Sequence, residues 1–534
     1  MSLRRVLVAG VALLVVGIAL FVALRPGSTT STSGAIGSPA ATASLVSSAA
    51  PTPTDSAGPP ASPSTPAPEV AIVPVVGYWS ADRSITTAEL RLALTGHDPA
   101  FKQVVVTSGD LAAIAAALGI VPDPRIRQLG PDAVIAAVQG TTGVLGLVQP
   151  EDVKPSVRAL GIDGRTLFGD ARVRTIADWA LTIPAPGSGT VAFDPAATWT
   201  VVAAGDVMND RAVYQEAVLR HHGPDFPWAG GTAKIVGRSC CVAGDSTVRA
   251  VATGNAGAVA NLFRNADLAL VNHEGPTPDH FSYHPLTYPS SLTFSFDPAL
   301  EAGLHDAGVD VVSLANNHIR NYGSLGVLQT IANVRAAGLT PVGAGRNLPA
   351  ANAPAWSTID GIRVAILAFD AIDTGANGAT ATRAGAAPLE LDRARADIRA
   401  ARAAGAQVVI VIPHWGVEYT STATASQRAD AEALIADGAD VILGSHPHWA
   451  GALEQIGAGV VVYSMGDFIF DLPRSERTDE GLIVELTFEG THLAQVDIHP
   501  TIELDRSQPN LLDPSDGQVV LERIRAASRD FLHW

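Results

Sequence analysis

Residues 440–451 read DVILGSHPHWAG: an apolar run, a Gly-Ser break, and then two histidines around a proline. The apolar run has the length and composition of a buried strand. In an extended chain His446 and His448 would point to opposite sides, but Pro447 and the turn after Gly444 can break that alternation. The stretch therefore predicts two imidazoles at the end of a buried strand. Each can reach a different metal, or one can reach a metal and the other a substrate.

Six more apolar runs in the same half of the chain have the composition of buried strands: Thr200–Ala204, Leu268–Val271, Val309–Leu314, Arg363–Phe369, Gln407–Ile412 and Gly459–Tyr463. Helical stretches stand between several of them: Pro298–Ala307, Ser324–Ala337, Glu390–Ala404 and Ala425–Asp437. Ser324 is the expected cap of its helix. The alternation predicts an α/β fold with a largely parallel sheet buried on both faces. In such sheets ligands bind beyond the carboxyl ends of the strands.

Potential metal ligands stand where these strands end: Asp206, Asn272, His273, Glu274, Asn316, Asn317, His318, His414, His446 and His448. Divalent transition metals bind imidazole nitrogens and carboxylate or amide oxygens at about 2.0–2.2 Å. Taken alone, an aspartate or an Asn-Asn pair after a strand is usually a turn former, and we interpret Asp370 and Asp373 in that way. The joint occurrence at strand ends predicts a metal site. A pair of metals about 3.5–4 Å apart would suit hydrolysis of a phosphate ester.

The first 25 residues predict a membrane anchor. Val6–Leu24 is uncharged and apolar, and it is long enough to cross a bilayer as a helix. Arg4 and Arg5 precede it, so the positive-inside rule places the rest of the chain outside the cytoplasm as a single-pass protein of the cell membrane. The alternative is a cleaved signal and a secreted protein. Residues 26–69 are rich in Ser, Thr, Pro, Ala and Gly and predict a disordered linker.

The remaining segments carry fewer signals. Residues 70–195 alternate strand-like and helical stretches, which predicts a small α/β domain of unknown role, and residues 501–534 are interpreted as a C-terminal tail. Cys240 and Cys241 are adjacent, and because a bridge between neighbours is strained we expect two unbridged residues in a loop. A strained bridge between them in an oxidising compartment is the alternative. The net charge of -17 repels nucleic acid phosphates, so nucleic acid is not an expected partner.

Six motifs in this order resemble the CapA family of poly-γ-glutamate capsule biosynthesis proteins, whose domain is related to calcineurin-like metallophosphatases: AAGDVM, ADLALVNHEGP, SLANNHIRNYG, IPHWGVEY, ADGADVILGSHPHW and VVYSMGDFIFD. The resemblance covers residues 198–472, with strands continuing to residue 500. It implies a metallophosphatase-like domain over residues 198–500. The implied fold is a four-layer α/β sandwich of two sheets, with a metal site at their shared edge.

The resemblance also implies roles for individual residues. The metal ligands would be Asp206, Glu274, Asn317, His414, His446 and His448. His318 would act as general acid or stabilise the phosphate, and Asn316 is a further candidate catalytic residue. The cofactor would be one or two divalent transition metals, with Mn, Zn and Fe all open.

Four positions bear on how many metals bind and on how they are held. Met208 stands where metallophosphatases carry a histidine, which removes one metal ligand and leaves open whether a second metal binds. Glu274 replaces an aspartate and lengthens the arm, His273 could be an added ligand, and Asp467 stands where the family usually has asparagine.

These features predict a membrane-anchored metal-dependent hydrolase that resembles a phosphoesterase and acts in making poly-γ-glutamate or another polymer of the cell envelope. Its partners would be an anionic polymer or a phosphoester substrate, together with membrane proteins that synthesise or export the polymer. Local basic residues such as Arg320 would offset the acidic exterior. The alternative is a non-catalytic binding or scaffold protein that spans the wall.

Overall fold

The computed structural model describes residues 68–185, 193–242, 245–285 and 292–529. The predicted anchor and the linker up to residue 67 lie outside these ranges. By internal contacts the chain divides into Met1–Thr65 and Pro66–Trp534, and everything described here belongs to the second unit. In the described part, no helix combines the length and the hydropathy that a membrane span needs. The second unit is a mixed α/β structure, as predicted.

The first part of this unit contains a five-stranded sheet in the order β5-β4-β6-β2-β7. Its strands are β2 (Val73–Gly77), β4 (Gln103–Thr107), β5 (Arg127–Leu129), β6 (Val144–Val148) and β7 (Val157–Ala159). Its helices are α1 (Thr87–Leu94), α2 (Leu111–Leu118) and α3 (Pro131–Val138). The short strands β1 (Glu69–Ala71) and β9 (Thr182–Pro184) pair with each other, as do β3 (Ser84–Ile85) and β8 (Gly161–Ile162). Its apolar core consists of residues of this part and Ala494 of the later chain, while Tyr78 and Trp79 belong to the core of the larger part.

The larger part is built on two sheets. The ten-stranded sheet has the order β12-β11-β27-β26-β25-β10-β13-β14-β15, and β24 also pairs with β10. Its strands are β10 (Thr198–Val207), β11 (Thr232–Val242), β12 (Asp245–Gly254), β13 (Leu268–His273), β14 (Val311–Ser313), β15 (Thr340–Val342), β24 (Asp467–Ile469), β25 (Glu480–Glu489), β26 (His492–Leu504) and β27 (Gln508–Leu512).

The six-stranded sheet has the order β17-β18-β20-β21-β23-β22. Its strands are β17 (Ala355–Ile359), β18 (Ile362–Asp370), β20 (Val408–His414), β21 (Val441–Leu443), β22 (Leu453–Ile456) and β23 (Gly459–Val462). A small pair, β16 (Ala344–Gly345) and β19 (Gly385–Ala386), stands apart from both sheets. The helices of this part are α4 (Arg211–Tyr214), α5 (Ala258–Asn265), α6 (Glu301–Asp306), α7 (Gly323–Ala336), α8 (Leu348–Ala351), α9 (Thr374–Asn377), α10 (Leu391–Ala403), α11 (Ala425–Ala436), α12 (Glu476–Asp479) and α13 (Pro514–Ala527).

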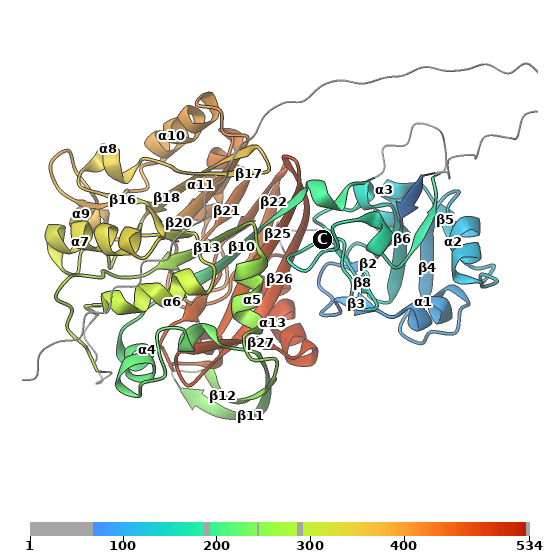
Figure 1. Ribbon diagram of the computed structural model, residues 1–534, viewed down its shortest axis with the longest axis horizontal. Coiled ribbons are helices and arrows are strands. Elements are labelled where there is room, and N and C mark those ends of the chain that lie inside the picture. The colour runs from blue at the N-terminus through green and yellow to red at the C-terminus, as the bar shows by residue number, and fades with distance from the viewer. Residues whose placement is uncertain (1–67, 186–192, 243–244, 286–291, 530–534) are drawn as a thin grey trace, which may run out of the picture. The chain divides into compact units, whose positions relative to one another are not determined.

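The strand residues alternate between apolar cores, as the two-residue period of an extended chain requires. In β18, Val364 and Ile366 join a core shared with the ten-stranded sheet, while Ala365 and Leu367 face a core formed with α10 and α11. In β10 the residues of the opposite face pack with α5, α6 and α7. The order of layers is therefore helices, sheet, sheet, helices, and Figure 1 shows α10 and α11 over the strands β18, β20 and β21.

The seven predicted strands and the parallel pairing of most of them are confirmed. Three expectations are wrong. Ser324 lies inside α7, whose N-cap is Tyr322. Cys240 lies in β11 and is disulfide-bonded. The segment after residue 500 is not a tail, because β26 and β27 continue the sheet and α13 contributes Leu521 and Ile524 to the core between the sheets.

Candidate metal centre

The end of β10 brings three predicted strand ends together. Asp206 is in register with Asn272 of β13 on one side and with Asp467 of β24 on the other. This arrangement needs glycine at position 205, because a Cβ atom there would lie 1.8 Å from the carbonyl oxygen of Gly466. The close approach of the two backbones therefore sets Asp206 and Asp467 beside each other.

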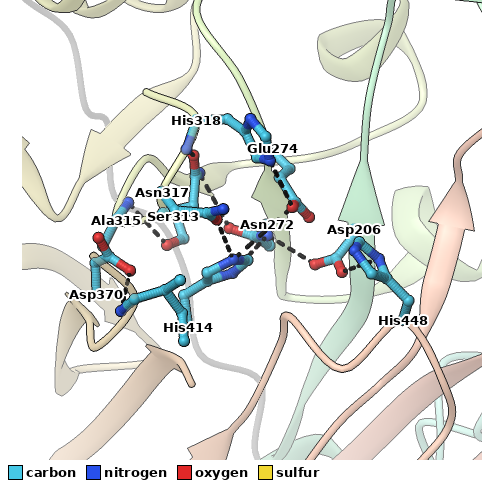
Figure 2. A network of polar contacts seen from close by, with 12 residues as sticks. Asp206, Asn272, Glu274, Ser313, Ala315, Asn317, His318, Asp370, His414 and His448 are labelled. Atoms are coloured by element: carbon cyan, nitrogen blue, oxygen red, sulfur yellow. Dashed lines mark hydrogen bonds and ion pairs between the residues drawn. The ribbon is translucent and has the colours of Figure 1, made fainter. Parts of the chain in front are cut away.

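One group of candidate ligands lies around Asp206. A ligand atom of Asp206, one of Glu274 and one of His448 lie within 4.8 Å of one another, and all three residues are buried. His448 Nδ1 is 2.8 Å from Asp467 Oδ1 and 3.4 Å from Asp206 Oδ2. Figure 2 shows the imidazole of His448 against the carboxylate of Asp206.

A second group consists of Asn317, His414 and His446. His414 Nε2 lies 2.9 Å from Asn317 Oδ1, and the rings of His414 and His446 are 4.9 Å apart between centroids. Glu274 joins the two groups, because its Oε1 is 3.8 Å from His414 Nε2 while the same side chain belongs to the Asp206 group. The predicted metal ligands are thus brought into one buried region with two adjacent halves (Figure 2).

The two histidines of the stretch DVILGSHPHWAG point to different parts of the centre. His446 has φ +97° and His448 has φ +59°, so both leave the extended conformation. Their ring centroids are 6.1 Å apart, with His446 on the His414 side and His448 on the Asp206 side. Such φ values are unfavourable for residues with a Cβ atom and are found at functional sites. The break in alternation expected around Pro447 is therefore present.

The donor atoms suit a cation. Among the described residues, five buried acceptor atoms of this region have no hydrogen-bond partner: Asp206 Oδ2, Glu274 Oε1 and Oε2, Asp467 Oδ2 and His446 Nδ1. A buried polar atom without a partner costs about 1–3 kcal/mol, so a cluster of them calls for an explanation. All five atoms belong to the side-chain types that hold divalent transition metals. The residues present therefore fit the metal that the sequence predicts.

The carboxylates repel one another strongly enough to shift their titration. Burial would raise the pKa of Asp206, but the close contact with His448 and the charge of His448 hold it at about 2. Burial and the charge of Asp206 raise the pKa of Glu274 well above its usual range. Burial also raises the pKa of Asp467 to about 7, against the opposing effect of His448. A divalent cation would relieve this crowding of negative charge.

The imidazoles of the second group stay neutral. Burial and the neighbouring ring of His446 lower the pKa of His414 well below its usual value. Burial and the charge of His448 lower the pKa of His446 to about 4. Neutral imidazole is the form that binds metals, so both side chains are in the required state at pH 7.

His318 lies at the edge of the centre. Its Nε2 is 3.9 Å from Glu274 Oε1, its Nδ1 is 3.2 Å from Asn321 Oδ1, and its ring lies 4.1 Å from that of Phe294. The backbone N–H of Phe294 donates to the same Asn321 oxygen, which makes this atom an acceptor and places the proton of neutral His318 on Nδ1. Nε2 therefore presents a lone pair toward the site.

Asn316 plays a different part from the one expected. Its side-chain amide donates to the backbone carbonyl of His273 at 2.8 Å, and its oxygen accepts from the backbone N–H of His318 at 3.2 Å. The side chain is fully buried. Asn316 therefore orients the loop that carries Asn317 and His318, and its amide also approaches Asn272 Oδ1 at 3.5 Å.

The sequence indicates no specific role for Asn272, and it marks Asp467 only as a departure from the asparagine of the family. The amide of Asn272 donates to Asp206 Oδ1 at 2.7 Å and approaches His414 Nδ1 at 3.3 Å, so it links the two halves. Asp467 orients His448. The strand-end position of both residues was visible in the sequence, but their partners depend on which strands become neighbours.

Two other departures from the family pattern are resolved by packing. Met208 is fully buried in an apolar cluster with Phe294, Phe296 and Phe470. His273 is also buried, and its two ring nitrogens are 2.8 Å from Glu301 Oε1 and 3.1 Å from the carbonyl of Gly275. Neither side chain is placed to be a ligand.

Asp370, interpreted above as a turn residue, is the fully buried last residue of β18 and is in register with His414. Its Oδ1 accepts from the backbone N–H of Ile372 at 2.9 Å, while Oδ2 has no partner among the described residues. Burial raises its pKa from 3.8 to about 8. A raised pKa means that the stability present below pH 3.8 is lost as the pH rises toward 8.

We therefore expect the free energy of unfolding of the Asp370→Asn variant to increase, relative to that of the wild type, as the pH rises. The difference should grow between pH 3.8 and 8, by up to about 1.4 kcal/mol per pH unit, and stay constant above that range. Chemical denaturation at a series of pH values measures it. Asp392→Asn, at a carboxylate on the surface, is the control. A difference for Asp370→Asn that does not change with pH would contradict the burial argument.

Comparison with known proteins agrees with these motifs. The family described as "Bacterial capsule synthesis protein PGA_cap" matches residues 200–472, just over half of the chain. The capsule biosynthesis protein CapA of Bacillus anthracis is 32% identical over 248 residues, which are 45% of this chain and 59% of that protein. The PGA biosynthesis protein CapA of Bacillus subtilis is 29% identical over 243 residues, 45% of this chain and 63% of that protein.

The chain therefore spans about six-tenths of the length of each of these relatives. Among solved structures, a 5'-nucleotidase precursor from Thermus thermophilus is similar with a TM-score of 0.33 and 14% identity, over 62% of this chain and 58% of that one. The matched region of the family contains every candidate ligand described above. The chain belongs to the bacterial capsule synthesis protein family PGA_cap.

Proposed function

We propose that this protein is a metal-dependent hydrolase that acts on a phosphoester or related bond during biosynthesis of poly-γ-glutamate or another anionic polymer of the cell envelope. The names of the relatives from both Bacillus species support the polymer. The enzymatic part rests on one observation, which is the buried set of unpartnered acceptor atoms at the strand ends.

In this proposal the ligands are divided between the two halves of the centre. Asp206, His448 and Glu274 would hold one cation, and Asn317, His414 and His446 would hold a second one with Glu274 shared. When bound, such cations supply a Lewis acid for the substrate oxygens and an activated water as nucleophile. Met208 leaves the first half without the expected histidine, but Asp467 already orients His448 there.

The part of His318 follows from its environment. Burial lowers its pKa to about 4, so at pH 7 the ring is neutral with a lone pair on Nε2. This side chain can accept a proton from the attacking water as a general base. The proposal therefore assigns a general base, where the family resemblance implies a general acid or a group that stabilises the phosphate.

The finer features of the sequence predictions also belong to the proposal. The helix–sheet–sheet–helix arrangement would be a metallophosphatase-like sandwich over residues 198–529. An N-terminal anchor would hold the protein at the cell membrane with the folded parts outside, next to the membrane proteins that make or export the polymer. Residues 70–195 would form a small α/β module that binds a ligand or acts as a spacer.

The test is hydrolysis by the full-length protein loaded with Mn²⁺, Zn²⁺ or Fe²⁺. Bis(p-nitrophenyl) phosphate and poly-γ-glutamate serve as substrates. We expect turnover of at least one of them, and a loss of about 10²–10⁴-fold in kcat for His318→Ala, the range for removal of a general acid–base. His305→Ala, at an exposed histidine, should behave like the wild type. Metal-loaded protein that cleaves neither substrate would leave the non-catalytic binding or scaffold role.

A further inference from the structure

Arg211 has a strained backbone. It follows the Asp206 strand end by a few residues and has φ +54°, in the left-handed region. This conformation costs about 1–2 kcal/mol for a residue with a Cβ atom. Hydrogen bonds hold it in place, since Asp210 Oδ1 accepts from the Arg211 N–H at 2.8 Å and Asp471 Oδ2 accepts from the Ala212 N–H at 3.1 Å. Backbone strain that the surroundings enforce is a mark of functional sites.

The Arg211 guanidinium is buried against Phe294, beside the metal centre. The Arg211 side chain is only 3% exposed, and its Cζ lies 4.8 Å from the centroid of Phe294. Phe294 in turn stacks on His318. Burial lowers the pKa of Arg211, while the charges of Asp471 and Asp210, and to a smaller extent Tyr419 and Glu274, act in the opposite direction. The cation therefore lies within electrostatic reach of both a candidate ligand and the candidate base.

A second arginine stands beside the Asp206 half of the centre. Arg474 Cζ lies 4.0 Å from the centroid of Tyr419, and the Tyr419 ring stacks on that of His448 with centroids 5.9 Å apart. Tyr419 has φ +60°, so this platform also depends on an unfavourable backbone conformation. The chain has a net charge of -17, so two arginines held next to one buried site differ from its mostly acidic composition.

Hydrogen-bond donors without acceptors lie in the same segments. In the described part of the chain, Asn209 Nδ2 and Trp449 Nε1 are buried and have no partner. Asn209 precedes Arg211 by two residues, and Trp449 follows His448. Buried acceptor atoms without hydrogen-bond partners suit a bound cation. Buried donors without partners, next to arginines, suit a bound anion.

We propose that Arg211 and Arg474 form an anion subsite that flanks the metal centre and holds a charged group of the substrate, a carboxylate or a phosphate, beside the bond to be cleaved. The inference rests on the proposed function. Guanidinium groups match both anions in geometry, because two parallel N–H bonds can reach two oxygens of one group. Arg211 is the inner contact, fixed by its backbone, and Arg474 is the outer contact, fixed on the Tyr419 ring.

The test is isothermal titration of the full-length protein with inorganic phosphate and, separately, with tri-γ-glutamate. Arg211→Gly removes the side chain but tolerates the positive φ, so the fold should be kept. We expect Arg211→Gly and Arg474→Met each to weaken binding about tenfold or more, as loss of a charge-assisted hydrogen bond would. Arg393→Met, at a half-exposed arginine of α10, is the matched control and should bind like the wild type.

The two ligands separate the two sources of the anion. Binding of phosphate that depends on both arginines would assign a phosphate group, and binding of tri-γ-glutamate alone would assign carboxylates. Unchanged affinity in both variants, or no binding of either ligand to the wild type, would overturn the subsite.

Metal content should stay at the wild-type level in both arginine variants, because no candidate ligand is altered. A loss of metal in these variants would also overturn the assignment. If the wild type binds an anion through these arginines but hydrolyses nothing, the hydrolase proposal fails and the subsite remains.

Discussion

Replacing His448 with alanine should reduce the bound metal of the purified full-length protein by at least half, and replacing His446 should do the same. The two side chains belong to different halves of the centre, because His448 contacts Asp206 and His446 contacts His414. Changes to the partners that merely orient a ligand cost about 10–100-fold in metal affinity, so loss of a ligand itself should cost more. Elemental analysis after reloading with Mn²⁺, Zn²⁺ or Fe²⁺ measures the effect.

The same experiment counts the metals. Two equivalents in the wild type and one in each variant would indicate an ion in each half. If the wild type binds one equivalent and only one variant loses it, the histidine replaced in that variant identifies the occupied half. That result would also show how Met208, in place of a histidine, affects metal binding. The control is His305→Ala, which alters a half-exposed histidine outside the centre. A wild-type protein that retains no metal after reloading with each ion would contradict both the metal centre and the hydrolase proposal.

The second large effect concerns stability. Trp199 of β10 is fully buried in the core between the two sheets, stacks on Phe488 of β25 with centroids 4.4 Å apart, and donates its indole N–H to the carbonyl of Gly490 at 2.7 Å. Trp199→Ala should lower the free energy of unfolding by about 3–5 kcal/mol, because it leaves a large cavity in the core and removes the hydrogen-bond donor of the Gly490 carbonyl. The midpoint of denaturant unfolding measures the change.

Trp356→Ala is the matched control. This tryptophan of β17 is 39% exposed, and its main polar contact is with Arg363. Its removal should change the free energy of unfolding by less than about 1 kcal/mol. Equal effects of the two substitutions would mean that the core between the sheets does not carry the stability assigned to it.

The sequence predicted the central strands well because these strands are buried on both faces. A strand such as β20 has to be apolar at successive positions, since Val408 and Ile410 face one core and Val409 and Val411 face another. The antiparallel strands at the end of the chain were not predicted as well. β25 and β26 bury polar residues such as Glu485, Thr487 and Gln495, so their pattern does not stand out.

Candidate ligands were predictable to the same extent as the strands that carry them. The parallel strands all end at one edge, so polar residues after each strand had to meet there. Asn316 shows the limit of that reasoning, because it occupies a strand end but hydrogen-bonds the backbone of His273 and His318. Asp370 shows the opposite error, since a turn-like position in the sequence is a fully buried carboxyl group in the fold.

The sequence by itself therefore determined the α/β alternation, the edge at which the candidate ligands gather and the family to which the chain belongs. Those features depend on local composition and on the order of motifs, which a single chain displays directly. Only the tertiary structure decided that His446 and His448 serve different halves, that Asn272 links the halves, and that Arg211 turns toward Phe294. Each of these depends on strand order, on register or on a positive φ, and such properties arise from contacts between residues that are far apart in the sequence.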